Sequence, residues 1–189
     1  MSSLVETVHI KNNSFSTYMT KEEIEYLVKN VAENINDYYK DITNENNPLI
    51  ILGVLNGSFM FLADLVKHIK LHCEIHFIKV SSYEGTESTG SITNIIGLNQ
   101  NIFEKDILIV EDIIDTGLTI NNLIDTLIKD NPLSINVCSM LWKTEKYNGR
   151  EIINTNFIGK EIPNKFVIGY GLDYDNFGRN LPDIYTINE

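Results

Sequence analysis

Hydrophobic positions near the start of the 189-residue chain follow a helical period. Residues 20–23 form a capping box, in which the hydroxyl of Thr20 is followed three residues later by the carboxylate of Glu23. Apolar side chains then recur every three or four residues, at Ile24, Leu27, Val28, Val31 and Ile35. This spacing predicts an amphipathic helix that ends near Tyr39.

Short apolar runs alternate with helical patterns further along the chain. Residues 49–55 are apolar throughout, as expected for a strand buried on both faces. Residues 59–69 repeat apolar side chains at helical spacing, with Phe59, Leu62, Leu65, Val66 and Ile69 expected to face inward. A third helix is expected at about 120–128, and further strands at 73–80, 91–98, 107–110, 135–141, 166–170 and 184–187. The alternation favours an α/β fold with a parallel twisted sheet flanked by helices.

Length, composition and charge limit the class of protein. The length suits a single domain, residues 1–189, and the 43% hydrophobic and 22% charged content is that of a globular chain. A net charge of −11 argues against nucleic acid as a partner, because such proteins usually present a basic face. The sequence contains no apolar stretch of the roughly 20 residues needed to cross a membrane and no signal-peptide pattern at its start. With only two cysteines, Cys73 and Cys138, we expect a cytoplasmic protein without disulfides.

Three carboxylates follow the apolar run 107–110 in the segment KDILIVEDIIDTGLTI, residues 105–120. Glu111 and Asp112 are expected at the carboxyl edge of the sheet, where open α/β sheets bind ligands. Residues 115–119 then turn into a helix, and their backbone N–H groups and hydroxyls suit one phosphate. Gly117 allows the tight bend that this turn requires.

The chemistry of this acidic turn favours a phosphorylated sugar. Adjacent carboxylates that point to opposite sides of a strand end do not suit a protein-only metal cage, but they suit vicinal hydroxyls or outer ligands of Mg²⁺. A phosphorylated ribose would match both halves of the motif, whereas the alternative is an exposed acidic loop that caps a helix. Walker-type nucleotide binding is disfavoured, because the Gly-x-x-x-x-Gly-Lys-Ser/Thr pattern does not occur.

The segment HIKLHCEIH offers potential zinc ligands at His68, His72, Cys73 and His76. Their spacing aligns them only on one continuous helix, yet we expect the helix to end near Ile69 and a strand to begin near Cys73. A second ligand pair with the spacing of structural zinc sites does not follow. We therefore expect no zinc site here.

The motif LIVEDIIDTGLT resembles the diphosphoribosyl-binding signature of type I phosphoribosyltransferases, and Asp115 is typical of their 6-oxopurine branch. The segments LNGSFMFLADL, VSSYEGTESTGS, LWKTEK and PNKFVIGYGLDYDNFGRNLPDIY also resemble hypoxanthine-guanine phosphoribosyltransferases, in the same order. The resemblance spans about residues 20–187. It implies the type I phosphoribosyltransferase fold, with a small purine-binding hood built mainly from the N-terminal segment and residues 143–189.

The resemblance implies transfer of ribose 5-phosphate from 5-phosphoribosyl-1-diphosphate to N9 of hypoxanthine or guanine, with Mg²⁺ present and diphosphate released. Family members usually form homodimers or homotetramers. Two alternatives stay open: a transferase for another base such as xanthine, and a regulator of the same fold that binds nucleotide without catalysis. Lys143 and Phe166 favour a 6-oxopurine, and the presence of Asp115, Asp173 and Arg179 speaks against the regulator.

Roles at the sugar and the metal also come from the resemblance. Glu111 and Asp112 would hold the ribose hydroxyls, and Asp115 would be the general base or acid at purine N7, a role that suits a carboxylate beside the base. The residues implied to bind the 5′-phosphate are Asp115, Thr116, Gly117, Leu118 and Thr119. The implied Mg²⁺ ligands are Glu111, Asp112 and Asp173.

For the purine, the resemblance implies that Lys143 donates to O6 and that Phe166 stacks on the ring. The purine edge would be read by Lys165, the backbone of Val167 and Asp173. Without the resemblance, Lys143 would be read as a solvated lysine and Phe166 as plain core, since these are the usual locations of such residues.

The residues implied to contact the diphosphate are Asn56, Gly57, Ser82, Tyr83 and Arg179. Residues 81–91 would form a mobile flap that excludes water from the sugar carbon, although an ordinary hairpin connection is the alternative.

The chain departs from the family pattern at two positions near the diphosphate. Asn56 stands where many members carry a basic residue, next to a backbone contact with an expected non-proline cis peptide bond. Lys146 stands where arginine is common, which keeps the charge but loses the planar fork. We expect both changes to weaken diphosphate binding.

Overall fold

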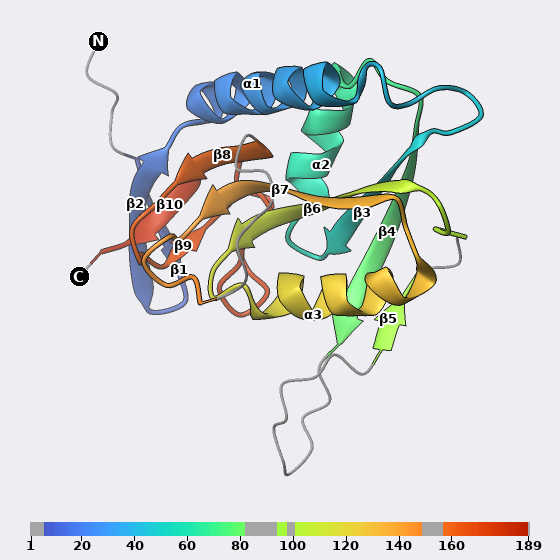
Figure 1. Ribbon diagram of the computed structural model, residues 1–189. Coiled ribbons are helices and arrows are strands. Elements are labelled where there is room, and N and C mark those ends of the chain that lie inside the picture. Colours follow the sequence, from blue (N-terminus) through green and yellow to red (C-terminus); the bar gives the residue numbers. More distant parts are fainter. Residues whose placement is uncertain (1–5, 82–93, 98–100, 149–156, 189) are drawn as a thin grey trace.

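The computed structural model describes residues 6–81, 94–97, 101–148 and 157–188, which form two sheets (Figure 1). The larger, the core sheet, has the strand order β5-β4-β3-β6-β7-β8. Its strands are β3 (Leu49–Leu55), β4 (Cys73–Ser81), β5 (Asn94–Ile96), β6 (Asp106–Ile114), β7 (Ser134–Trp142) and β8 (Ile158–Glu161). Strands β4, β3, β6, β7 and β8 run parallel, and β5 pairs antiparallel to β4. The predicted parallel sheet is therefore confirmed.

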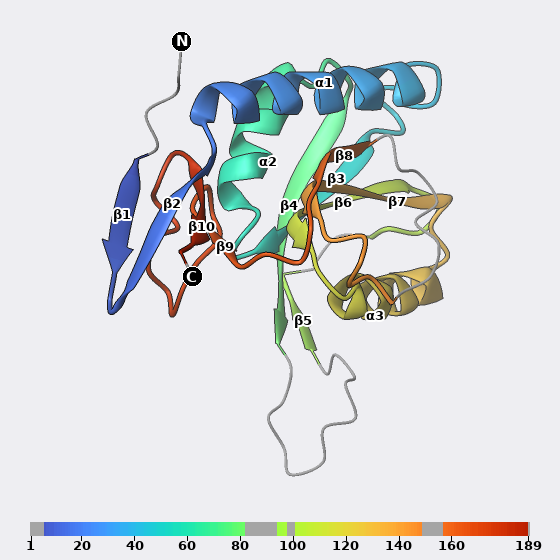
Figure 2. The same cartoon turned by 90° about the vertical axis from the view of Figure 1, so that its left-hand side faces the viewer.

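Helices cover both faces of the core sheet. Helices α1 (Lys21–Tyr39) and α2 (Phe59–Leu65) lie on one face, and α3 (Leu118–Leu127) lies on the other (Figures 1 and 2). Short 3₁₀ helices, η1 (Val66–His68) and η2 (Ile128–Asp130), extend α2 and α3.

Strand β3 is apolar throughout because both of its faces are buried. Leu49 and Ile51 pack in the cluster beneath α1 and α2, whereas Ile50 and Leu52 pack in the cluster beneath α3. Helix α1 begins where its capping box predicts, since Thr20 and Glu23 exchange side-chain to backbone hydrogen bonds. The sequence-based expectations for these two elements are confirmed.

The smaller sheet, here called the hood sheet, brings the two ends of the chain together. Its order is β1-β2-β10-β9, and every pairing is antiparallel. Its strands are β1 (Thr7–Ile10), β2 (Asn13–Met19), β9 (Val167–Ile168) and β10 (Ile184–Ile187). The carboxyl ends of β6 and β7 point toward this sheet (Figure 1), so the carboxyl edge of the core sheet faces the hood.

Several element boundaries differ from the sequence-based expectations. The strand expected at 166–170 ends at Ile168, because Gly169 and Tyr170 adopt positive φ values of 92° and 49°. The strand expected at 91–98 covers only Asn94–Ile96. Phe59, expected to face inward, is 40% exposed, and Phe61 is buried in its place. Strands β1, β2 and β8 were not predicted.

The segment with the potential zinc ligands divides as expected. His68 ends η1, whereas Cys73 and His76 lie on β4. Within the described residues, none of the helices combines the length and the apolar character needed to cross a bilayer.

Candidate active site

The acidic end of β6 extends beyond its pairing with β3. The ladder between these strands ends at Gly53 and Val110, while the ladder between β6 and β7 continues to Ile114. Glu111 and Asp112 therefore lie at the carboxyl edge of the sheet, as expected, although β6 itself continues past the predicted run 107–110 to Ile114. A cavity of about 430 Å³ lies here, and it is lined by Val54, Leu55, Asn56, Gly57, Val80, Glu111, Asp112, Leu118, Thr119, Asn122, Asp173 and Arg179.

Glu111 and Asp112 form a coupled acidic pair. Glu111 is only 7% exposed, and this burial, together with the charge of Asp112, raises the pKa of Glu111 well above its usual range. Burial also raises the pKa of Asp112, although the N–H of Ile113 (2.9 Å) and the charge of Arg179 oppose this shift. The charge of Asp112 contributes to the raised pKa of Glu111, so the two carboxyls act on each other. Such a pair is stabilised by hydroxyl donors or by a cation.

Asp173 and Arg179 join this acidic pair in the same cavity. Arg179 Nη2 lies 2.6 Å from Asp173 Oδ1, and Arg179 Nη1 donates to the carbonyl oxygen of Gly171 at 2.7 Å. The other oxygen of Asp173 accepts the N–H of Asn176 at 2.7 Å. The structure therefore brings together Asp112, Asp173 and Arg179, which the sequence assigned to one site.

The loop after β3 contacts the hood through a glycine. The peptide bond between Leu55 and Asn56 is cis, as the resemblance implies. Gly171 has a φ of 99°, and a Cβ there would lie 2.0 Å from the carbonyl oxygen of Gly57. Only glycine fits this approach. Sequence reasoning missed Gly171, although the Gly-Tyr-Gly pattern at 169–171 signals an unusual backbone.

Residues 115–119, here called the phosphate loop, connect β6 to α3. Gly117 caps α3 in the left-handed conformation, with a φ of 83°, and the N–H of Leu118 donates to Thr116 Oγ1 at 3.4 Å. A second cavity, of about 190 Å³, is lined by residues 111–120. Since Thr116, Leu118 and Thr119 are exposed beside the N-terminal N–H groups of α3, the loop can bind an anion.

Two lysines contact Asp115, the first residue of the phosphate loop. Lys143 Nζ lies 3.2 Å from Asp115 Oδ2, and Lys146 Nζ lies 3.0 Å from Asp115 Oδ1. Burial raises the pKa of Asp115, but the hydrogen bonds and charges of Lys146 and Lys143 outweigh this effect, so the pKa is lowered overall. Asp115 is therefore held as a carboxylate.

Neither of the two lysines lies where its sequence context predicts. Lys143 is 6% exposed, so it is not the solvated lysine that its sequence context alone suggests. Lys146 was expected to serve the diphosphate, yet its ammonium lies on Asp115. Lys146 is also absent from the described residues that line the 430 Å³ cavity.

Phe166 presents an aromatic surface at the start of β9. Phe166 is 44% exposed, and its ring packs edge-on against Tyr174, with centroids 5.8 Å apart, and at a tilt against Phe15 at 6.5 Å. The N–H of Ile187 donates to the carbonyl of Phe166, and this register directs the N–H and C=O of Val167 away from β10. A planar ligand could therefore stack on Phe166 and hydrogen-bond to Val167.

Other predicted residues contribute differently or lie outside the described chain. The ammonium of Lys165 lies 5.4 Å from the ring centroid of Tyr18, a cation–π contact within the hood. Ile162, four residues before Phe166, donates its N–H to the carbonyl of Trp142, which places Phe166 within about 14 Å of that strand. Ser82, Tyr83 and all but the first residue of the expected flap lie outside the described residues.

The carboxylates suit a magnesium ion that a substrate helps to hold. Among the described residues, no group of three or more His, Cys, Asp or Glu side chains converges into a complete metal cage. The cavity nevertheless offers the oxygens of Glu111, Asp112 and Asp173. Mg²⁺ commonly binds one or two carboxylates and takes its remaining ligands from water and phosphates, so this donor set fits that ion.

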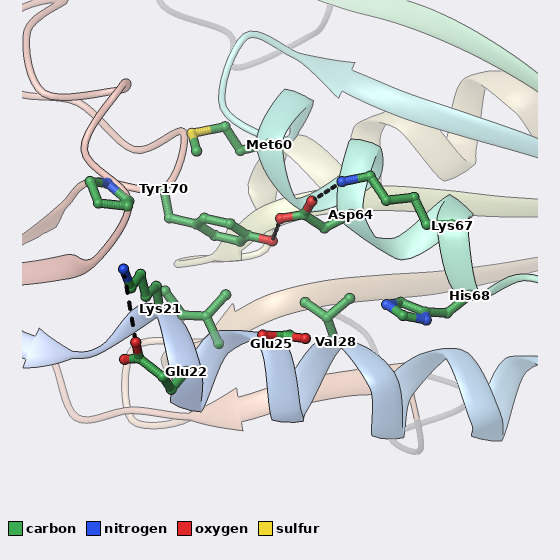
Figure 3. A pocket seen from close by; sticks show the side chains of 11 residues that line it. Lys21, Glu22, Glu25, Val28, Met60, Asp64, Lys67, His68 and Tyr170 are labelled. Carbon is green, nitrogen blue, oxygen red and sulfur yellow. Dashed lines mark hydrogen bonds and ion pairs between the residues drawn. The ribbon is translucent and has the colours of Figure 1, made fainter.

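A larger cavity, of about 490 Å³, lies between α1, α2 and the hood (Figure 3). Its polar groups bond to one another: Asp64 accepts from Lys67 at 2.6 Å and from the hydroxyl of Tyr170 at 2.9 Å. None of the described residues that line it carries one of the predicted site functions. The candidate active site is therefore the carboxyl edge of the core sheet.

Comparison with known proteins agrees with this geometry. Residues 20–175 match the model of the phosphoribosyl transferase domain family. The chain is 36% identical to a hypoxanthine-guanine phosphoribosyltransferase of Aquifex aeolicus, over 95% of this chain and 98% of that protein. It is 41% identical to one of Staphylococcus epidermidis, over 89% of this chain and 91% of the relative.

A solved structure shows the same architecture. It is the hypoxanthine phosphoribosyl transferase of Trypanosoma cruzi, studied for the role of its C-terminal region in oligomeric state and activity. The two chains superpose with a TM-score of 0.82 at 36% identity, over 96% of this chain and 95% of the other. The likeness therefore covers both the core sheet and the hood sheet.

Proposed function

The chain belongs to the phosphoribosyl transferase domain family, and on that premise we propose that it is a purine-salvage enzyme with hypoxanthine-guanine phosphoribosyltransferase activity. It transfers ribose 5-phosphate from 5-phosphoribosyl-1-diphosphate to N9 of the purine and forms IMP or GMP with diphosphate. One observation carries this proposal: a buried lysine, Lys143, is paired with Asp115, the first residue of the phosphate loop. This arrangement supplies a purine-reading donor and a proton acceptor next to a sugar-phosphate site.

The sugar phosphate is held along the acidic strand end. The phosphate loop binds the 5′-phosphate through the N–H groups at the start of α3 and the hydroxyls of Thr116 and Thr119. Glu111 and Asp112 accept hydrogen bonds from the ribose hydroxyls, which relieves the repulsion between two buried carboxyls. Since the phosphate loop directly follows the strand end that carries Glu111 and Asp112, the ribose phosphate is held both at its 5′-phosphate and at its hydroxyls.

The purine lies between Phe166 and the lysine turn. Lys143 donates to O6, which selects a 6-oxopurine over adenine, because the amino group of adenine at that position is itself a donor. Phe166 stacks on the ring, and the backbone of Val167 hydrogen-bonds to its edge. As the bond between N9 and C1′ of the ribose forms, the proton on N7 moves to the carboxylate of Asp115.

The bond between C1′ and the diphosphate breaks in the same step, so negative charge develops on the leaving group. Arg179 binds that charge, together with the N–H groups near Gly57. Glu111, Asp112 and Asp173 would hold Mg²⁺, and the bound ion would supply further positive charge to the leaving diphosphate. The ribose becomes positively charged in this step and lies beside the carboxylates of β6.

The fold also supports proposals about assembly and location. Phe59, Ile75 and Phe77 are 40%, 43% and 46% exposed, and a Cβ on Gly53 would approach both Phe77 and Leu62 of α2. We infer that this apolar surface beside α2 forms a homodimer or homotetramer contact. The free thiols of Cys73 and Cys138 fit a reducing cytoplasm.

An ultraviolet assay tests the proposed function. The protein is mixed with 5-phosphoribosyl-1-diphosphate, Mg²⁺ and one base at a time: hypoxanthine, guanine, xanthine or adenine. We expect turnover with hypoxanthine or guanine, and none with adenine. Turnover with xanthine alone would reassign the substrate, whereas nucleotide binding without turnover on any base would favour a regulator.

The variant Asp115→Asn tests the proposed proton acceptor. An amide cannot accept the N7 proton, so kcat should fall by about 10²-fold or more, within the usual contribution of general acid–base catalysis. The KM for the donor should change far less. Equal losses in kcat and in donor affinity would assign Asp115 to binding instead.

A further inference from the structure

The carboxylate of Asp115 has two ammonium partners that differ in burial. The side chain of Lys143 is 8% exposed and that of Lys146 is 42% exposed. Both belong to one turn, residues 143–148, that follows β7. Under the proposed function, on which this inference rests, the ammonium of Lys143 also donates to O6 of the purine, so its three donors are divided between the base and Asp115. Lys146, which is not assigned to the base, is then the cation that serves Asp115 alone.

We propose that Lys146 is a positioning residue for phosphoribosyl transfer, which holds the Asp115 carboxylate in place as an ionised proton acceptor while Lys143 binds the purine oxygen. In this arrangement the two lysines divide two tasks. Lys143 reads the base, and Lys146 keeps the acceptor charged and oriented.

The turn that carries Lys146 is fastened to the phosphate loop on both sides. The N–H of Lys143 donates to the carbonyl of Ile114 at 2.9 Å, and the N–H of Asn148 donates to the carbonyl of Thr116 at 3.1 Å. These two bonds flank Asp115 in the sequence, just as their donors flank Lys146. The backbone of Lys146 is thus held beside Asp115, unlike an exposed ion pair between two independent segments.

Aromatic packing reinforces the same attachment. The ring of Tyr147 occupies the space that a Cβ on Gly117 would need, at 2.2 Å, and it packs edge-on against Trp142 with centroids 5.7 Å apart. Tyr147 also shares a side-chain hydrogen bond with Asn121 of α3. The turn, the phosphate loop and α3 therefore form one packed unit, so Lys146 needs little reorganisation to reach Asp115.

Charge supports this assignment. Burial alone would raise the pKa of Asp115, and Lys146 and Lys143 are the cations that lower it. The other charged residues on the carboxyl end of β6 and on the turn 143–148 are acidic: Glu111, Asp112 and Glu145. Without Lys146, the pKa of Asp115 would rise whenever Lys143 is engaged by the purine.

Two variants and a matched control test the inference. Lys146→Met removes the charge, Lys146→Arg keeps it, and Lys129→Met removes an exposed lysine at the far end of α3. For each, kcat and KM for hypoxanthine and donor are measured across pH, and melting temperatures verify folding. We expect Lys146→Met to lower kcat by about ten-fold, to change the donor KM less than two-fold and to move the acid limb of the kcat profile to higher pH. Lys146→Arg and Lys129→Met should resemble the original protein.

Each contrary result has its own meaning. An unmoved acid limb in Lys146→Met, or a loss confined to the donor KM, would overturn the inference, and the latter would return Lys146 to the diphosphate. If Lys129→Met moved the acid limb by the same amount, the shift would come from the change in net charge alone, and the inference would also be overturned. Absence of turnover by the original protein on all four bases would defeat the proposed function first, and the two failures are thereby distinguished.

Discussion

The carboxylate of Asp112 lies directly over the Cα of Gly57, and a Cβ at Gly57 would come within 1.7 Å of Asp112 Oδ2. Gly171, which follows β9, approaches the carbonyl oxygen of the same Gly57. Three segments from distant parts of the sequence therefore meet without an intervening side chain. This packing brings the loop after β3, the end of β6 and the hood into one cavity.

We predict that Gly57→Ala destabilises the protein and weakens donor binding. The added methyl group must displace the carboxylate of Asp112 or the backbone, and overpacking of this kind costs about 1–3 kcal/mol. In a domain of this size, the melting temperature should fall by roughly 2–4 °C for each kcal/mol. The donor KM should rise, because the displaced groups line the diphosphate cavity.

A double-mutant cycle tests whether the methyl group of Gly57→Ala clashes with the carboxylate of Asp112. Asp112→Ala removes the carboxylate, so Gly57→Ala should lower the melting temperature less in this background than in the original protein. An equal loss in both backgrounds would show that the methyl group strains another contact, such as the approach of Gly171.

We predict that Glu111→Gln raises thermal stability at neutral pH. Burial and the neighbouring Asp112 raise the pKa of Glu111 in the folded state, whereas in the unfolded chain it titrates near its ordinary value of 4.5. Above that value the folded state binds more protons than the unfolded state, so Glu111 makes stability fall as pH rises. Glutamine is neutral at every pH and removes this loss.

Melting curves of the free protein and of Glu111→Gln, recorded between about pH 4 and pH 8 without Mg²⁺, check this prediction. The variant should gain its advantage progressively above the ordinary pKa of glutamate, and little difference should remain at the acid end. A difference that stays constant across pH would mean that packing, and not ionisation, separates the two proteins.

Those elements whose pattern reflects burial could be predicted from sequence. The core strand Leu49–Leu55 and helix α1 follow from apolar periodicity and a capping box, and both were predicted near their observed boundaries. Strands β1 and β8 have only four residues each, and β2 carries polar side chains at Asn13, Ser14, Ser16 and Thr17, because hood and edge positions leave these strands partly exposed. Their formation depends on partners far away in the sequence, which a local pattern does not contain.

At the candidate active site, the sequence predicted which residues take part, but it did not predict which of them contact one another. Asp112, Asp173 and Arg179 line one cavity, as the motif order implied. The raised pKa of Glu111 beside Asp112 and the position of Lys146 on Asp115 were not predicted. Both depend on side-chain direction at a strand end and in a turn, where neither the helical nor the strand period determines orientation.

We predict that Asn56→Lys lowers the donor KM. Asn56 is exposed and lines the cavity with Asp112 and Arg179, so an ammonium there would add a positive charge beside the diphosphate. A gain of about three-fold to ten-fold corresponds to roughly 1 kcal/mol, the usual scale of a partly solvated charge contact. Initial rates at varied donor concentration check this, with Asn56→Gln as the uncharged control. An unchanged KM in Asn56→Lys would show that the backbone alone governs binding at this position.

We predict that Phe166→Leu impairs purine binding while leaving donor binding nearly intact. Leucine retains apolar contact with Phe15 and Tyr174 but lacks the flat surface on which a base stacks, and one base–aromatic stack is worth about 1–3 kcal/mol. The KM for hypoxanthine should therefore rise roughly ten-fold, since 1.4 kcal/mol is a factor of ten in binding.

Phe166→Tyr, which keeps the ring, should stay close to the original protein. Phe103→Leu provides the matched control, because Phe103 is similarly exposed but lies before the amino end of β6, at the opposite edge of the sheet. The decisive readout is the difference between the KM values for the two substrates, because stacking affects only the base. If Phe166→Leu raised both KM values equally, the ring would be supporting the hood and its neighbouring cavity, and the purine would have to stack elsewhere.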